Sequence, residues 1–346
     1  MALNGATRDK TVAPFATASS SLSGREERLS GRTQELARKK LWMERVYAQS
    51  TDRAAESVPT TTELSGTLPS FFVIGPPRTG TTWLYEILRE RTLLPAPTKE
   101  TRFFDTHFHR GLDWYSAHFP ASPTKYRIGE VAPTYFASTK ASERIAKVLP
   151  EARVVCIFRN PVERILSLYK LKCAYGLIPW TFEQAMVRDP EMLESGKYAT
   201  KLQAWQCALG GDQVMPLLYD DLKHAPQSFL NTLVDFIGVP RFALKESQTQ
   251  SVHASEVMTY PRSYRRTRNA STLADWFKAR RLDRVVAAVR NSPLRRLFLG
   301  GGPPFAELPL EIVSGLYDLF RPEVEKLETM LNRDLSAWKS IREQAA

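Results

Sequence analysis

Short apolar runs alternate with longer amphipathic stretches along most of the chain. Residues 71–75, 152–158 and 212–219 are apolar and contain several β-branched side chains, a composition typical of strands buried in a parallel sheet. Each run is followed by a stretch in which apolar residues recur with helical spacing. This alternation predicts an α/β fold with a central, mostly parallel β-sheet flanked by helices.

The two ends of the chain differ from this pattern. Residues 1–69 are rich in Ala, Ser, Thr and Arg and contain too few apolar side chains to offset the entropy of ordering, so they are expected to form a mobile leader, with one possible helix over residues 24–50. Residues 70–346 are expected to form one folded domain. Within it, residues 305–342 have the periodicity of one or two amphipathic helices, broken near Pro322.

Charge narrows the class of partner. The 346 residues have the apolar and charged fractions of an ordinary globular protein, 43% and 25%, which excludes a chain that is disordered, collagenous or coiled-coil throughout. The formal net charge is +11, and residues 262–296 carry most of it, because they hold eleven basic and two acidic side chains. This segment is expected to be helical, and such an excess indicates an anionic partner.

The cysteines and the apolar runs suggest a reducing compartment. Cys156, Cys173 and Cys207 are odd in number and lack the paired spacing of a zinc site, so they are expected to be reduced thiols. No apolar run approaches the roughly 20 residues that span a bilayer. The first residues also lack the apolar core of a secretory signal. A cytoplasmic location is therefore expected.

A glycine-containing turn follows the first predicted strand. Gly75-Pro-Pro-Arg-Thr-Gly-Thr-Thr82 stands between that strand and a predicted helix, the arrangement in which main-chain N–H groups at a helix N-terminus bind phosphate. The spacing almost fits the ATP-binding loop G-x-x-x-x-G-K-[ST], but Thr81 stands at the position of the lysine. A kinase would thereby lose its main cation for the transferred group. The cation present is Arg78.

The second predicted strand ends in a cation as well. Arg159-Asn160-Pro161 follows it directly, and Ser167 lies eight residues further on in a predicted helix. Ligands of open parallel sheets bind at the carboxyl edge of the strands, so Arg159 and Ser167 are expected to face a second phosphate there. The third strand is followed by Asp220 and Asp221, which either cap the next helix or, as in a kinase, hold magnesium; the cap is the favoured reading.

Together these elements resemble the sulfotransferases that use 3′-phosphoadenosine 5′-phosphosulfate (PAPS). The similarity lies in "FFVIGPPRTGTTWLYEIL" and "RVVCIFRNPVERILSLYK", and extends to "KETRFFD", "GLDWYSAHFP", "GEVAPTYF" and "GKYATKLQAW" as found in heparan sulfate sulfotransferases and bacterial relatives. The resemblance implies a P-loop-like nucleotide fold that needs no metal. It implies that the 5′-phosphosulfate is held by Arg78, Thr79, Gly80, Thr81 and Thr82, and the 3′-phosphate by Arg159 and Ser167. Arg262 lies where related enzymes have a loop that closes over the nucleotide.

The same resemblance assigns the acceptor side. In the family, the glutamate three residues before the Phe-Phe pair acts as base, and Glu100 occupies that position. Arg78 stands where the family often has lysine; it would stabilise the charge on the leaving group but is a poor proton donor. On the substrate side, Lys99 is expected to contact the sulfuryl group during transfer, and Arg102 and Asp105 are expected to line the acceptor pocket. Three histidines follow downstream, and contact with the acceptor is less expected for them than an ordinary place in the loop: His107, His109 and His118.

The expected activity is in-line sulfuryl transfer to a hydroxyl or amine of a carbohydrate or small metabolite. The alternatives are a nucleotide-dependent kinase and a non-catalytic anion-binding protein on the same fold. Nucleic acid is not an expected partner, because no recognition motif accompanies the basic charge. Residues 273–296 have an apolar stripe opposite arginines, which is also compatible with weak contact to a membrane surface.

Overall fold

The computed structural model describes residues 68–120, 126–253, 258–279 and 301–341. The chain divides into two compact units, Met1–Val58 and Pro59–Ala346, and all described residues belong to the second. The possible helix over residues 24–50 therefore lies outside the described residues, as does the rest of the leader up to residue 67.

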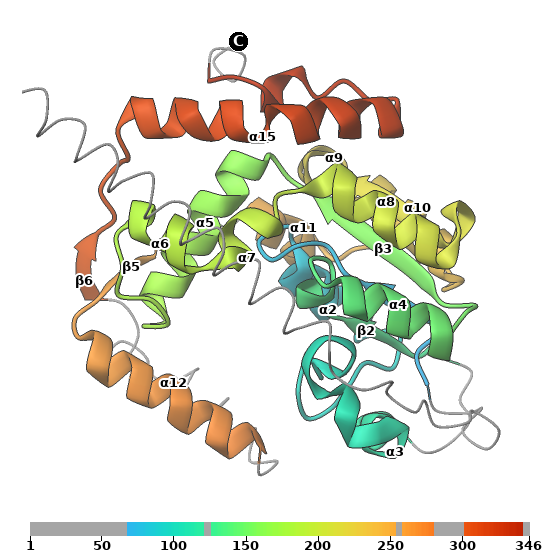
Figure 1. The fold of residues 1–346 in the computed structure, drawn as a ribbon. Helices are drawn as coiled ribbons and strands as arrows, with labels where there is room; N and C mark the ends of the chain where they lie inside the picture. Colours follow the sequence, from blue (N-terminus) through green and yellow to red (C-terminus); the bar gives the residue numbers. More distant parts are fainter. Residues whose placement is uncertain (1–67, 121–125, 254–257, 280–300, 342–346) are drawn as a thin grey trace, which may run out of the picture. The chain divides into compact units, whose positions relative to one another are not determined.

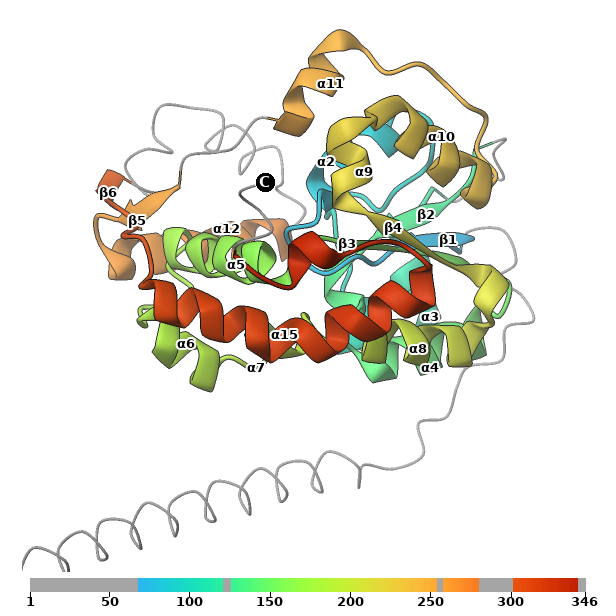
Figure 2. The same ribbon diagram turned by 90° about the horizontal axis from the view of Figure 1, so that it is seen from above.

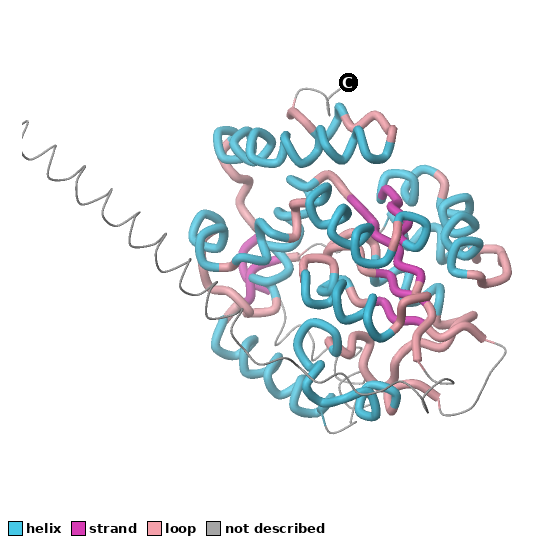
Figure 3. The backbone as a smooth tube through the Cα atoms, turned by 45° about the vertical axis from the view of Figure 1, so that its right-hand side comes forward, coloured by secondary structure: helices cyan, strands magenta, loops and turns pink. Residues whose placement is uncertain are grey.

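A four-stranded parallel sheet forms the centre of the described part (Figure 1; magenta in Figure 3). Its order is β2-β1-β3-β4, and its strands are β1 (Phe71–Val73), β2 (Gly129–Val131), β3 (Arg153–Phe158) and β4 (Val214–Leu218). β1 pairs with both β2 and β3. The three strands predicted from the apolar runs and their parallel arrangement are confirmed. β2 was not predicted.

Helices cover both faces of the sheet (Figure 2). On one face, Val73 of β1 and Val155 of β3 share an apolar core with Leu84 and Leu230 from two of the helices there. On the other face the packing is aromatic: the rings of Phe158 and Tyr198 lie 4.9 Å apart. The first face carries α2 (Thr81–Leu88), α9 (Tyr219–His224) and α10 (Pro226–Ile237), and the second carries α4 (Thr139–Val148) and α8 (Tyr198–Leu209).

The helix after β3 begins with two local signals. Asn160 caps α5 (Pro161–Ala174) by accepting the main-chain N–H groups of Val162 and Glu163, and Pro161 occupies the first helical position, where its missing N–H costs nothing. The remaining short elements are α3 (Gly111–Ser116), α6 (Phe182–Arg188), α7 (Pro190–Glu194), α11 (Glu246–His253), a π-helical turn Phe103–His107, and 3₁₀ turns at Phe108–Arg110, Pro133–Tyr135, Gly211–Gln213 and Ser336–Trp338.

The C-terminal segment forms a single helix, α15 (Leu310–Leu331), which continues through Pro322. The predicted break at this proline is wrong. Tyr317 and Phe320 before the proline and Val324 and Leu327 after it are all buried, so packing on both sides offsets the hydrogen bond that proline removes.

The basic segment is described only in part. α12 (Tyr264–Ala279) confirms its helical start, and residues 280–300 lie outside the described residues. A two-stranded antiparallel sheet, β5 (Thr259–Pro261) and β6 (Gly301–Pro304), flanks it in sequence. Within the described ranges, no helix combines the length and apolar character needed to cross a membrane. All three cysteines are free thiols, as predicted.

Candidate functional site

Two loops leave the same edge of the sheet, because β1 and β3 are adjacent and parallel. The loop after β1 depends on its two glycines. A Cβ atom on Gly75 would lie 2.8 Å from the backbone nitrogen of Ile157 in β3, and Gly80 has a φ of +88° at the N-cap of α2. Glycine adopts that left-handed conformation without the steric cost of a side chain. The loop therefore lies close against β3 and turns into α2, whose first N–H groups have no acceptor within the helix, as in the predicted phosphate site.

A hydrogen bond joins the two predicted halves of the nucleotide site. Arg78, in the loop after β1, donates from Nε to the Oγ of Ser167 in α5 over 2.9 Å. The two residues are 89 positions apart in the chain. Arg78 also adopts a φ of +78°, an uncommon conformation for a residue with a side chain. The fold thus brings together the residues assigned to the two phosphate groups.

The threonines of the loop differ in their surroundings. Thr79 is fully buried and donates its hydroxyl to the Pro76 carbonyl over 2.8 Å, so its side chain closes the loop. Thr81 is buried at the start of α2, and Thr82 is exposed. Their part in holding a nucleotide stays a prediction.

Arg159 follows β3 and is held in place by three groups. Its guanidinium donates to a carboxylate oxygen of Glu163 over 2.8 Å and lies 5.2 Å above the ring of Tyr219. Its carbonyl accepts the hydroxyl of Tyr198 over 2.9 Å. The side chain is only partly exposed, so these contacts fix Arg159 at the edge of the sheet.

The predicted cofactor contact Arg262 belongs to the described part of the chain. It follows β5, is exposed, and donates from Nε to the carbonyl of Gly301 over 3.0 Å. Residues 280–300, which come between α12 and β6, are outside the described residues. The role of Arg262 stays a prediction.

The segment carrying Glu100 lies against α2. The ammonium of Lys99 sits 5.6 Å from the ring centroid of Tyr85 in α2 and 3.6 Å from a carboxylate oxygen of Glu100. Burial raises the pKa of Glu100 above its usual value, although Lys99 and Arg102 oppose the shift, and burial lowers the pKa of Lys99. The raised pKa makes Glu100 a stronger base than an exposed glutamate. Its segment lies next to α2, the helix that begins after the loop of Gly75 and Gly80.

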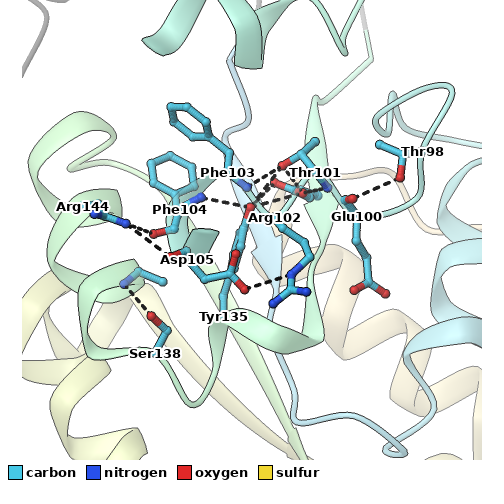
Figure 4. A network of polar contacts seen from close by, with 12 residues as sticks. Thr98, Glu100, Thr101, Arg102, Phe103, Phe104, Asp105, Tyr135, Ser138 and Arg144 are labelled. Carbon is cyan, nitrogen blue, oxygen red and sulfur yellow. Dashed lines mark hydrogen bonds and ion pairs between the residues drawn. The ribbon is translucent and has the colours of Figure 1, made fainter. Parts of the chain in front are cut away.

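Arg102 and Asp105 extend this polar surface. Arg102 has a φ of +54° just before the π-helical turn, and its Nε lies 3.5 Å from one oxygen of Asp105. The other oxygen of Asp105 is buried and has no hydrogen-bond partner among the described residues. In Figure 4 the side chains of Glu100 and Arg102 extend in the same direction, away from the rings of Phe103 and Phe104. A substrate with several polar groups would find both charges here.

The three histidines are occupied mainly by neighbours in their own segment. His118 contacts the carbonyl of Trp114 through Nδ1 over 2.9 Å. His107 stands edge-on to the ring of Trp114, with centroids 5.6 Å apart, and burial lowers its pKa. His109 lies beside His107. None of these contacts points to a catalytic role.

Glu130, a fully buried carboxyl on β2, was not predicted from the sequence. Its Oε1 accepts the main-chain N–H of Thr101 over 2.8 Å and the Thr101 hydroxyl over 2.7 Å, and its Oε2 accepts the hydroxyls of Tyr115 over 2.7 Å and Tyr135 over 3.2 Å. Burial raises the pKa of Glu130 to about 7, while the hydrogen bonds from Tyr115 and Thr101 limit the rise. The polar residue within "GEVAPTYF" was the available signal.

This carboxyl makes the stability of the protein depend on pH. The pKa of Glu130 is about 7 when folded and near the ordinary 4.5 when unfolded. Between these values the folded chain holds a proton that the unfolded chain has lost. The free energy of unfolding therefore falls as pH rises through this window, by roughly 3 kcal/mol in all. Urea unfolding at pH 5 and pH 8 should show that fall, and Glu130→Gln should remove it; equal pH dependence of both proteins would contradict this reading.

The acids after β4 have structural contacts. Asp220 accepts the indole N–H of Trp338 over 3.0 Å, and Asp221 forms an ion pair with Arg333 over 2.8 Å. Both lie in the first turn of α9, whose N-cap is Leu218, so the predicted helix cap is wrong. Both acids therefore hold the C-terminal segment against α9. Within the described ranges, no group of three or more acidic, histidine or cysteine side chains could hold a metal ion.

One family model and several curated proteins are similar in sequence to this chain. Residues 68–283 match the model of the family described as "Sulfotransferase domain". The bifunctional heparan sulfate N-deacetylase/N-sulfotransferase 1 of Mus musculus is 31% identical over 194 residues, and the corresponding protein 2 of Bos taurus is 29% identical over 198 residues. These matches cover 49% and 51% of this chain but only 22% of each relative.

A solved structure shares the fold. The sulfotransferase from Alicyclobacillus acidocaldarius superposes with a TM-score of 0.55 at 19% identity, over 79% of this chain and 99% of that one. The match extends well beyond the strands and the phosphate loop and includes most of the described chain.

Proposed function

Because the chain belongs to the sulfotransferase domain family, we propose that it transfers a sulfuryl group from PAPS to a hydroxyl or amine of a carbohydrate or small-molecule acceptor. The observation that carries the proposal is the hydrogen bond between Arg78 and Ser167. It joins the loop of Gly75 and Gly80, which lacks the lysine of an ATP-binding loop, to the segment after β3, which begins with Arg159 and not with a magnesium-binding acid. Two cationic centres at one sheet edge suit a nucleotide with phosphate groups at both its 5′ and 3′ positions.

The residues fit the two ends of such a donor. The N–H groups at the start of α2 and the guanidinium of Arg78 would hold the 5′-phosphosulfate. Ser167 and Arg159 would hold the 3′-phosphate, with Arg159 leaving Glu163. PAPS itself supplies the activated sulfuryl group. No metal ion is required in this account, because the cations come from the chain.

The acceptor side completes the reaction. Glu100 takes the proton of the acceptor hydroxyl or amine as its oxygen or nitrogen forms a bond to sulfur. The bond between sulfur and the bridging oxygen of the 5′-phosphate breaks, and its electron pair stays on that oxygen. Arg78 and the loop N–H groups stabilise the charge that collects there. Lys99, which lies beside Glu100, would contact the sulfuryl group during its transfer.

The acceptor class is proposed from the site and the relatives. The cations of Arg102 and Lys99 and the carboxylate of Glu100 are partly exposed and offer both charges to an acceptor, which suits a polar one such as a sugar. The relatives from Mus musculus and Bos taurus are named for heparan sulfate N-sulfation, so an amino sugar is a sensible first candidate. Small alcohols and phenols are the alternatives.

Radiolabelled sulfuryl transfer tests this function. The purified chain is incubated with ³⁵S-labelled PAPS and three acceptors: an N-deacetylated glycosaminoglycan, a mixture of simple alcohols and phenols, and no acceptor. We expect label in at least one acceptor and release of 3′-phosphoadenosine 5′-phosphate (PAP). Binding of PAP without transfer of label to any acceptor would favour the non-catalytic alternative.

Glu163 should weaken nucleotide binding in the wild-type protein. Its carboxylate is partly exposed and holds Arg159, so an incoming 3′-phosphate must displace it. Exposed ion pairs are worth about 0.2–1 kcal/mol. Glu163→Gln should therefore bind PAP about two- to five-fold more tightly in a calorimetric titration. Weaker binding by this variant would show that Glu163 orients Arg159 for the ligand instead of competing with it.

A further inference from the structure

The main chain next to Glu100, the proposed base, is held by one network of buried hydrogen bonds. Glu130 on β2 receives the main-chain N–H and the hydroxyl of Thr101, the residue after Glu100. The Thr101 hydroxyl also accepts the N–H of Phe103 over 3.1 Å. The Tyr135 hydroxyl accepts the N–H of Phe104 over 3.3 Å. Three main-chain N–H groups between Thr101 and Phe104 are thereby fixed, directly or through one hydroxyl, to a single carboxyl.

Burial of the Glu130 carboxyl costs free energy of folding. A fully buried carboxyl loses its hydration, and apolar side chains of similar volume would fill the same space at less expense. A carboxylate does offer what apolar groups cannot, because its two oxygens can accept four hydrogen bonds at once. Here its donors come from the loop of Thr101, from α3 through Tyr115, and from the turn of Tyr135.

The network also maintains an unfavourable conformation. Arg102 lies between the fixed N–H groups of Thr101 and Phe103 and has a φ of +54°. A left-handed conformation in a residue with a side chain persists only where its surroundings impose it. Figure 4 shows the result: the fixed backbone lies on one side, and the side chains of Glu100 and Arg102 leave it on the other.

We propose that Glu130 is a positioning residue for sulfuryl transfer, which sets the place of the Glu100 carboxylate through the backbone of Thr101 and Arg102 and touches neither donor nor acceptor. This proposal rests on the proposed function. It separates two tasks within one site: the loop after β1 and Arg159 bind the nucleotide, and β2 fixes the base against it.

The test compares Glu130→Leu with Glu130→Gln. Leucine fills the space but accepts nothing, whereas glutamine keeps one oxygen for Thr101 and an amide group that can donate to Tyr115. A displacement of about 1 Å in a catalytic group can cost on the order of 100-fold in rate. We expect Glu130→Leu to lose about that factor in kcat with the Kd for PAP within two-fold of wild type, and Glu130→Gln to regain most of the rate.

A second measurement does not depend on activity. Amide hydrogen exchange of residues 98–107 should be faster in Glu130→Leu and near wild type in Glu130→Gln, whatever reaction the protein performs. If the wild-type protein transfers no sulfuryl group, the proposed function fails while the exchange result still reports on the network. If Glu130→Leu does not fold, Thr101→Val decides, since it removes only the hydroxyl bonds and should lower kcat about ten-fold.

Two results would overturn the proposal. One is a folded Glu130→Leu variant, or a Thr101→Val variant in its place, with wild-type kcat. The other is a loss of PAP affinity in proportion to the loss of kcat, because this would indicate general damage and not a displaced base.

Discussion

Replacing Glu100 by glutamine should lower kcat for sulfuryl transfer by about 10²–10⁴-fold while the Kd for PAP stays within two-fold of wild type. The carboxylate accepts a proton that an amide cannot, and the amide has nearly the same shape, so nucleotide binding is spared. Steady-state rates with the best acceptor and a calorimetric titration with PAP measure the two quantities. Glu311→Gln, an exposed glutamate in the first turn of α15, is the matched control and should change neither.

The pH profile gives the same residue a second test. Burial raises the pKa of Glu100, and the base must be ionised to accept a proton. The rate should therefore rise with pH through a pKa above the ordinary value of a glutamate, and the glutamine variant should lack this rise. Full activity of Glu100→Gln would remove the base from the account and leave positioning and electrostatics as the source of the rate.

Arg159→Ala should weaken PAP binding by about 10- to 100-fold, since a charge-assisted hydrogen bond to a phosphate contributes about 1.5–3 kcal/mol. Part of that loss would come from Glu163, whose carboxylate is left facing the phosphate. The double variant Arg159→Ala/Glu163→Gln separates the two effects and should recover a few-fold of the affinity. Calorimetry with PAP measures each protein.

Arg241→Ala is the control for this experiment. Arg241 is also paired with a carboxylate, that of Asp235 at the end of α10, but lies outside the site. Its removal should leave PAP affinity unchanged. Equal affinity of Arg159→Ala and wild type would mean that the second anion site lies elsewhere at the sheet edge.

The parts of the fold that were predictable are those with a strong local signal. Strands β3 and β4 are continuous apolar runs, and the loop at Gly75 and Gly80 combines an unusual glycine spacing with a following amphipathic stretch. These features depend on neighbouring residues, so the sequence contains them directly. The loops after β1 and β3 lie close together because these strands pair in parallel. The hydrogen bond between Arg78 and Ser167 confirms that the two segments meet.

The features that were missed depend on residues distant in the chain. β2 has three residues, and its central one is Glu130, which by composition argues against a buried strand. It is buried because Thr101, Tyr115 and Tyr135 supply donors that no local pattern reveals. In the same way, Pro322 does not end α15 because the helix is packed on both sides of it, and Asp220 meets Trp338 across 118 positions.

A titration of the wild-type protein with PAP, beside ATP with magnesium, tests the central claim most directly. The two proposed anion sites, which the hydrogen bond between Arg78 and Ser167 joins, should bind the bisphosphate in the absence of any metal, with a single site seen by calorimetry and a rise in Tm. ATP with magnesium should bind far more weakly, because Thr81 replaces the lysine of a kinase loop. Tight binding of ATP with magnesium and none of PAP would contradict the account.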